Sequence, residues 1–178
     1  MHVKLYKPDS ERRLYWQAWD CDGRVAFHTG EVGRRGTTEW VTPSANQTPE
    51  ETIRARAEAA GREGFAPVGL EAMEQIILSC PTESDWTPDE ILGVARYLEE
   101  LCNECLGWTG LGHCDGRSYG PRSVGVCSLV VDQALGIQAI IAELQRHGCE
   151  GKDEELVLSV PEGAGFRVVY TTGPPSNG

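Results

Sequence analysis

The sequence predicts an α+β protein in which a small sheet with one helix is followed by a second unit of strands and helices. Three observations support this prediction. Apolar side chains alternate at the two-residue period of strands in several short segments. Two segments begin with Thr-Pro followed by two acidic residues, an order typical of a helix start. The surplus of acidic residues is confined to the second part of the chain.

The first part of the chain reads as strands followed by a helix. The alternation predicts strands over residues 2–7, 14–19, 24–29 and 37–42, with Asp22-Gly23 as a hairpin turn. Thr48, Pro49 and Glu51 form a capping box with proline at the first helical position, which predicts a helix ending at Gly61 or Gly64. These elements predict a domain over residues 1–68.

The second part contains two further helices between strands. Thr87-Pro88 begins a helix over residues 87–105, and Asp132 caps another that ends at Gly148. Strands are expected over residues 73–80, 108–114 and 124–131, and over 156–160 or 166–171, or both, with a turn at 161–165. This βαββαβ succession is the ferredoxin-like arrangement. The predicted domain covers residues 69–172, and a disordered tail is expected over 173–178.

Charge divides the chain at the same place. The 178 residues include 16 basic and 27 acidic side chains, a formal net charge of −11. Residues 1–68 hold equal numbers of each sign, so the whole imbalance lies in residues 69–178. A surface of that sign repels phosphate backbones and favours a basic partner, although acidic surface also serves solubility alone.

Composition indicates a cytoplasmic protein. No apolar run is long enough to span a membrane, and no signal-peptide core is visible, so neither a membrane nor a secreted location is expected. The seven cysteines are an odd number and lie mostly in apolar patterns, which predicts reduced thiols.

Cysteine and histidine are the residue types that could carry metal or nucleophilic chemistry. A zinc site is built from cysteine and histidine ligands, and four such residues lie close together in the sequence: Cys102, Cys105, His113 and Cys114. However, Cys102 and Cys105 fall on the apolar stripe of a helix, and His113 and Cys114 point to opposite faces of a strand. We therefore predict no metal site, no cofactor and no catalytic residue.

The segment between the two inner strands of the second domain is the first candidate for a binding site. It is predicted to be a loop over residues 115–123, and loops carry function disproportionately. Asp115 precedes glycine, as a turn requires, whereas Arg117, Tyr119 and Arg122 have no such local role. Because Arg and Tyr are favoured at interfaces, these four residues are candidate contacts for a partner or ligand.

The first domain resembles the WGR domain family. The resemblance rests on AFHTGEVGRRGTT at residues 26–38, with Tyr15-Trp16 as the aromatic strand, Gly30, Val32, Gly33 and Gly36 as the glycine framework, and Gly64-Phe65 closing the helix. It implies that fold and, in DNA-binding members, recognition of DNA ends. The Trp and Arg of the family motif are replaced here by Thr29 and Glu31, and Glu31 adds repulsion towards phosphate. Arg34, Arg35 and Glu31 are the candidate contacts.

The second domain resembles uncharacterised bacterial proteins more faintly. The residues concerned are LGWTGLGHCDGRSYG, followed by a strand and VVDQA. Some such small acidic proteins are thought to act as immunity proteins against polymorphic toxins, and the resemblance implies that role by analogy.

Together these features predict a non-enzymatic two-domain interaction protein that binds a basic protein, and a bacterial immunity protein is one form of this prediction. One alternative is a nucleic-acid-binding accessory protein that acts through the WGR-like domain. The other is a ferredoxin-like domain that binds a small molecule or acts as an enzyme.

Overall fold

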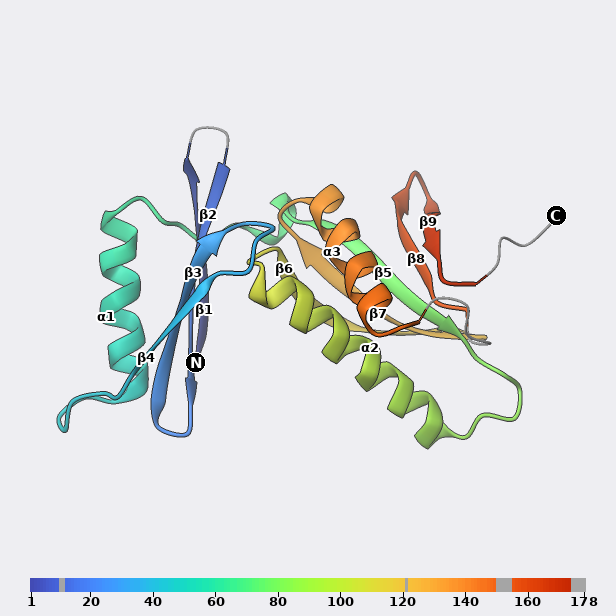
Figure 1. Ribbon diagram of the computed structural model, residues 1–178, viewed down its shortest axis with the longest axis horizontal. Helices are drawn as coiled ribbons and strands as arrows, with labels where there is room; N and C mark the ends of the chain where they lie inside the picture. Colours follow the sequence, from blue (N-terminus) through green and yellow to red (C-terminus); the bar gives the residue numbers. More distant parts are fainter. Residues whose placement is uncertain (10–11, 121, 150–154, 174–178) are drawn as a thin grey trace. The chain divides into compact units, whose positions relative to one another are not determined.

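The computed structural model describes residues 1–9, 12–120, 122–149 and 155–173. This part of the chain is mixed α+β, with two antiparallel sheets and three α-helices (Figure 1). It divides into two compact units. The first comprises Met1–Gly69 with Trp108–Gly110, and the second comprises Leu70–Gly107 with Leu111–Gly178.

The first unit is a four-stranded antiparallel sheet with one helix. Strands β1 (His2–Asp9), β2 (Arg12–Cys21), β3 (Arg24–Glu31) and β4 (Thr37–Val41) lie in chain order. Helix α1 (Pro49–Arg62) begins with the predicted capping box, in which the Thr48 side chain accepts from the Glu51 amide and Glu51 accepts from the Thr48 amide. The four strands and the helix predicted for this part of the chain are confirmed.

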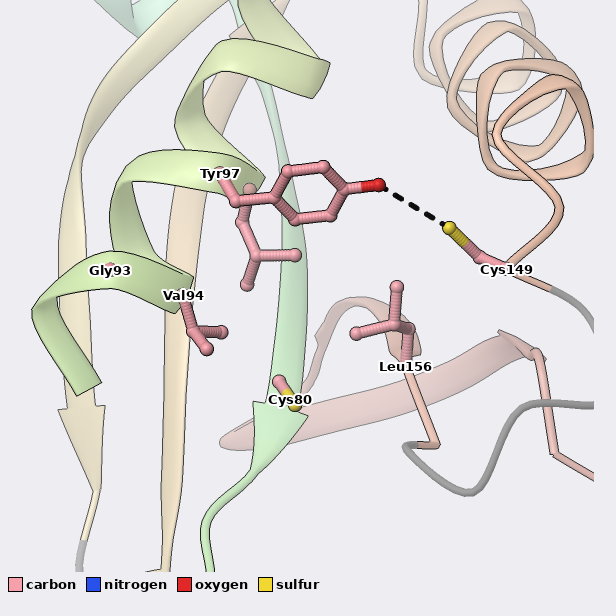
Figure 2. A pocket seen from close by; sticks show the side chains of 7 residues that line it. Cys80, Gly93, Val94, Tyr97, Cys149 and Leu156 are labelled. Carbon is pink, nitrogen blue, oxygen red and sulfur yellow. Dashed lines mark hydrogen bonds between the residues drawn. The ribbon is translucent and has the colours of Figure 1, made fainter. Parts of the chain in front are cut away.

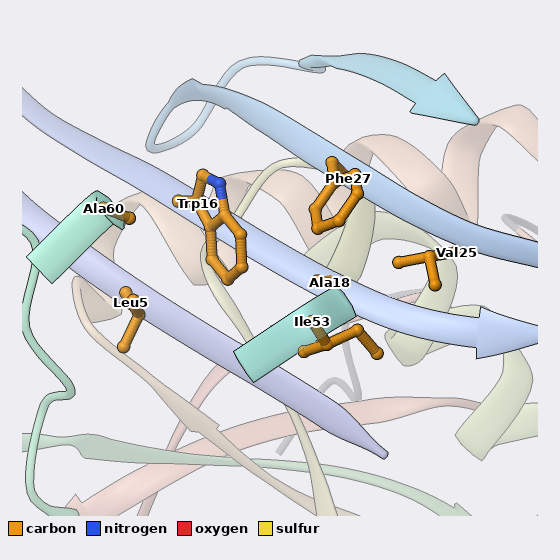
Figure 3. Close-up of a cluster of buried hydrophobic side chains, with 7 residues drawn as sticks. All are labelled: Leu5, Trp16, Ala18, Val25, Phe27, Ile53 and Ala60. Carbon is orange, nitrogen blue, oxygen red and sulfur yellow. The ribbon is translucent and has the colours of Figure 1, made fainter. Parts of the chain in front are cut away.

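The core of the first unit lies between α1 and one face of its sheet. Ile53 and Ala60 of α1 are buried against an apolar cluster from three strands, as Figure 3 shows. The strand residues of this cluster are Leu5, Trp16, Ala18, Val25 and Phe27. Burial of these side chains is the main term that holds α1 on the sheet.

The described residues of the second unit form five strands, two helices and one 3₁₀ turn (Leu70–Ala72). In chain order its elements are β5 (Glu74–Pro81), α2 (Pro88–Trp108), β6 (Gly112–Gly120), β7 (Ser123–Val130), α3 (Gln133–Arg146), β8 (Val157–Glu162) and β9 (Gly165–Thr171). The sheet order is β6-β7-β5-β8-β9, with every neighbouring pair antiparallel. Both C-terminal segments that were candidate strands are therefore strands. β8 pairs with β5, and β9 forms the outer edge.

Two predictions for the second unit are wrong. Trp108 ends α2 and does not begin a strand, and β6 begins later, at Gly112. The segment expected to be a loop over residues 115–123 is instead mostly strand, because β6 continues to Gly120 and β7 begins at Ser123. A bulge between Cys114 and Gly116 takes up the Asp-Gly pair that looked like a turn. Most of the predicted disordered tail, residues 174–178, lies outside the described residues.

The two faces of the second sheet differ. Alternate residues Ile76 and Leu78 of β5 are buried, and Gly136 of α3 lies against Ile76 and Val130. Figure 1 shows α2 and α3 on one side of this sheet. We call that side the helix face and the opposite side the open face. Asp132 caps α3 as predicted, accepting from the amide of Leu135 at 2.9 Å.

Candidate functional site

The predicted contact residues near Cys114 lie on strand β6 and its hairpin. Arg117 and Tyr119 are opposite Val126 and Val124, so they share the helix face of the sheet edge. Nε and Nη2 of Arg117 donate to Glu99 of α2 at 2.9 and 2.6 Å. Tyr119 is 57% exposed, Arg122 is exposed beside the hairpin, and Asp115 is exposed at the bulge. The structure therefore brings Arg117 and Tyr119 together.

Glu31, Arg34 and Arg35 lie together in the first unit, at the turn after β3. Glu31 pairs with Arg12 and Arg34, each at 3.5 Å. The guanidinium of Arg35 lies 5.1 Å from the ring centroid of Trp108, in a cation–π contact. Both arginines are thus already in contact with the protein's own side chains.

Helix α2 carries an acidic surface that sequence reasoning did not single out. It has five acidic side chains and one basic one, Arg96. The acidic residues are Asp89, Glu90, Glu99, Glu100 and Glu104, all of them exposed except the half-exposed Glu99. At its first turn, Glu90 accepts hydrogen bonds from the amide and hydroxyl of Thr87, both at 2.7 Å, which lowers the Glu90 pKa. The Glu90 carboxylate therefore stays charged at neutral pH.

An apolar cavity of about 290 Å³ opens beside the exposed side of α2. Figure 2 shows its lining: Cys80, Gly93, Val94, Tyr97, Leu98, Cys149 and Leu156. The Tyr97 hydroxyl and the Cys149 sulfur are 3.5 Å apart and supply the polar edge of this lining. Burial is the main cause that raises the Tyr97 pKa to about 12, so this phenol is neutral over the physiological range.

A second hollow continues the cavity towards the start of α2. It has a volume of about 340 Å³ and is lined by Trp86, Glu90, Gly93 and Val94. Because Gly93 has no side chain and a Cβ there would meet no atom within 4 Å, the helix surface stays open where both hollows meet. Together, the two hollows offer an apolar recess beside a charged carboxylate. We call them, with Tyr97, the α2 recess.

Three thiols of the second unit gather between α2 and β6. The Cys114 sulfur lies 3.5 Å from the Ser128 hydroxyl, and the Cys105 thiol donates to the Cys102 carbonyl at 3.4 Å. A hydrogen bond from the Cys102 thiol lowers the Cys114 pKa. His113 pairs with Leu129 on the open face, whereas Cys114 pairs with Ser128 on the helix face. His113 therefore does not share a proton with the Cys114 thiol.

The described residues contain no group of three or more His, Cys, Asp or Glu placed to hold a metal ion. All seven cysteines lie in the described part, and none is disulfide-bonded there. No helix in that part is long and apolar enough to cross a membrane.

Sequence reasoning also missed a buried polar cluster in the first unit. Tyr15 and His28 are buried on the sheet face opposite α1, where their rings stack with centroids 5.4 Å apart. Trp108–Gly110 binds this face, with the amide of Gly33 donating to Thr109 at 2.9 Å and the hydroxyl of Tyr15 donating to Trp108 at 3.1 Å. The polar groups of this cluster form their hydrogen bonds mainly with one another and with nearby backbone groups. We therefore infer that the cluster stabilises the fold and is not a binding site.

Comparisons of the chain with protein-family models, with curated proteins and with solved structures find no match. The resemblances to WGR domains and to immunity proteins therefore stay predictions.

Proposed function

We propose that this chain is a non-enzymatic interaction protein that binds a basic protein through the acidic side of α2 and the α2 recess. One observation carries the proposal. An exposed acidic helix borders an apolar recess, and Tyr97, which is 41% exposed, lies between them.

The recess suits an anchoring side chain of a protein partner. Binding energy at interfaces is concentrated in a few aromatic, arginine or aliphatic anchors that fill pockets, with charged residues around them. Here an apolar anchor would enter between Val94 and Leu156. Its basic neighbours would meet Glu90 at the second hollow and Glu100 on the exposed surface of α2. Complementary charge raises the association rate and excludes acidic competitors.

The proposed domain types agree with this assignment. The order β6-β7-β5-β8, with both helices on one face, supports a ferredoxin-like second domain to which β9 has been added. The meander β1–β4 with α1 supports a WGR-like first domain. Engagement of Arg34 by Glu31 and of Arg35 by Trp108 favours a protein over DNA as the partner. A cytoplasmic immunity protein that blocks a basic toxin is one concrete form of this function.

The first experiment identifies the partner and its salt dependence. The tagged full-length chain is used to capture proteins from host lysate at low and high salt, and the dissociation constant of the captured protein is then measured by calorimetry. We expect a basic protein in stoichiometric amounts and an affinity that falls as salt rises. A partner whose affinity is indifferent to salt contradicts the charge argument, and a gel shift with nicked DNA at low salt would favour the nucleic-acid alternative.

Two pairs of variants locate the surface. Glu100→Lys on α2 should weaken the complex about 3- to 10-fold, whereas Glu58→Lys on α1 makes the same change in net charge and should not. Gly93→Leu should fill the recess and weaken binding more strongly. Gly107→Leu is its control in the same helix, because a Cβ at Gly107 also meets no atom within 4 Å. Equal affinities within both pairs would exclude α2 as the binding surface.

A further inference from the structure

The paired positions described on the open face of the second sheet hold no Asp, Glu, Lys or Arg. On this face, Ile77 of β5 is paired with Cys127 of β7 on one side and with Ser159 of β8 on the other. Ser159 is in turn opposite Val168 of β9. Asp115 and Val169 lie at bulges and belong to neither row. Among the other described residues of β5–β9 assigned to this face, none is Asp, Glu, Lys or Arg, although such residues make up 24% of the chain.

Apolar side chains on this face are accessible. At its β9 edge, Phe166 is 59% exposed and Val168 is 54% exposed, while Ile77, Leu129 and Val157 are partly exposed. Charged residues of the same edge lie on the other face, where Arg167 pairs with Glu162 at 2.9 Å. The rest of the face holds uncharged polar residues such as Gln75, Ser79 and Ser159, and depletion of charged residues is typical of interface cores.

The size of the open face suits a weak dimer. Five strands at about 4.8 Å spacing, each roughly 23 Å long, give a face of about 550 Å². Two such faces together bury an area at the low end of specific interfaces, where complexes are transient.

We propose that the open face is the contact of a homodimer, in which the second sheets of two copies pack face to face. The whole net charge of −11 lies in residues 69–178, so the charged surfaces of two second units repel each other. On the second unit, the open face is where two copies can meet without placing like charges in contact, and a two-fold axis brings the same uncharged rows of each copy together. A basic partner, by contrast, gains no electrostatic attraction from an uncharged face.

Salt separates this dimer from the complex with a basic partner. Screening reduces the repulsion between two acidic copies, so dimerisation should strengthen as salt rises. Binding of a basic protein to α2 should weaken under the same change. Failure of one proposal therefore leaves the other standing.

The test is sedimentation equilibrium of the full chain from about 5 to about 500 µM, at low and moderate salt. We expect a reversible dimer that dissociates on dilution and is stabilised by salt. Phe166→Lys and Val168→Lys should each leave the chain monomeric over that range, with an unchanged unfolding temperature because both positions are exposed. Leu70→Lys is the matched control, since Leu70 is 65% exposed but lies outside the sheet, and it should dimerise like the native chain. A native chain that stays monomeric at the highest concentration, or lysine variants that dimerise normally, would overturn the proposal.

Discussion

The phenolic oxygen of Tyr15 lies 2.6 Å from Nε2 of His28, on a buried face of the first sheet. The Tyr15 hydroxyl also donates to the carbonyl of Trp108 at 3.1 Å. Nδ1 of His28 forms a hydrogen bond of 2.9 Å with the hydroxyl of Thr38. The relay connects β2 and β3 to β4 and to Trp108.

Removing the Tyr15 hydroxyl should destabilise the protein. Tyr15→Phe removes the phenolic hydrogen-bond partner of the buried His28 ring, which costs about 1 to 2 kcal/mol of unfolding free energy. Tyr6→Phe is the matched control. Tyr6 is also buried on this sheet, but its hydroxyl has no hydrogen-bond partner in the described structure. Its loss should cost less than about 0.5 kcal/mol, as measured by urea unfolding followed by circular dichroism. Equal losses in the two variants would show that the relay contributes nothing.

His28 should make stability depend on pH below neutrality. Burial is the main cause that lowers its pKa below the ordinary value of 6.5, and the positive charges of Lys4 and Arg35 add to this. The unfolded chain therefore binds a proton more readily than the folded one. Stability from the neutral imidazole is complete above pH 6.5 and is lost as pH falls through 6.5 towards the folded-state pKa.

The pH dependence can be assigned by comparing two proteins. Unfolding temperatures of the native chain and of His28→Gln are measured between about pH 5 and 7.5, above the range in which ordinary carboxylates titrate. The native chain should lose stability towards the acid end, and the variant should show a flatter profile. Parallel profiles would place the titrating group elsewhere.

Most helices and strands could be predicted because the signals for them lie within a few neighbouring residues. The capping box of Thr48 and Glu51 and the Asp132 cap act within one turn of helix, so they can be read without the tertiary fold. The segment after Cys114 failed for the opposite reason. Taken alone, the Asp115-Gly116 dipeptide indicates a turn. In the structure, pairing with β7 continues β6 past this dipeptide, which forms a bulge instead of a turn.

Contacts between residues far apart in the chain could not be predicted from the sequence. The Tyr15 hydroxyl meets a carbonyl 93 positions later in the chain, and nothing near Tyr15 marks Trp108 as its partner. The α2 recess likewise joins Cys80, Tyr97 and Cys149, which share no motif. The acidic residues of α2 were visible as part of the charge imbalance. Their position beside an apolar recess depends on how β5, α2 and the segment after α3 pack.

Gly36 should be irreplaceable because two groups approach it closely. A Cβ at this position would overlap the carbonyl oxygen of Thr29 and the hydroxyl of Tyr15. Gly36→Ala should therefore cost more than about 2 kcal/mol of unfolding free energy. Gly61→Ala is the control, since Gly61 lies in α1 with open space around it, and alanine there should stabilise the helix by up to about 1 kcal/mol. Thermal unfolding of both variants checks the contrast, and a tolerated Gly36→Ala would contradict the close approach.

Thiol reactivity should single out one cysteine of the seven. Cys21 is exposed at the end of β2, whereas Cys80, Cys102 and Cys149 are buried. Burial is the main cause that raises the Cys105 pKa to about 12, which keeps that thiol protonated and unreactive. With an aromatic disulfide reagent near neutral pH, the native chain should show one fast thiol, and the unfolded chain should show all seven.

The competing thiol is Cys114. Its pKa is lowered by a hydrogen bond from the Cys102 thiol, but its sulfur is half-buried between α2 and Ser128. Because a thiolate must also be reached by the reagent, we expect access to decide in favour of Cys21. Cys21→Ser should then abolish the fast phase, while Cys114→Ser should leave it intact. If the fast phase survives in Cys21→Ser and disappears in Cys114→Ser, the Cys102–Cys114 contact makes the reactive thiol of this protein.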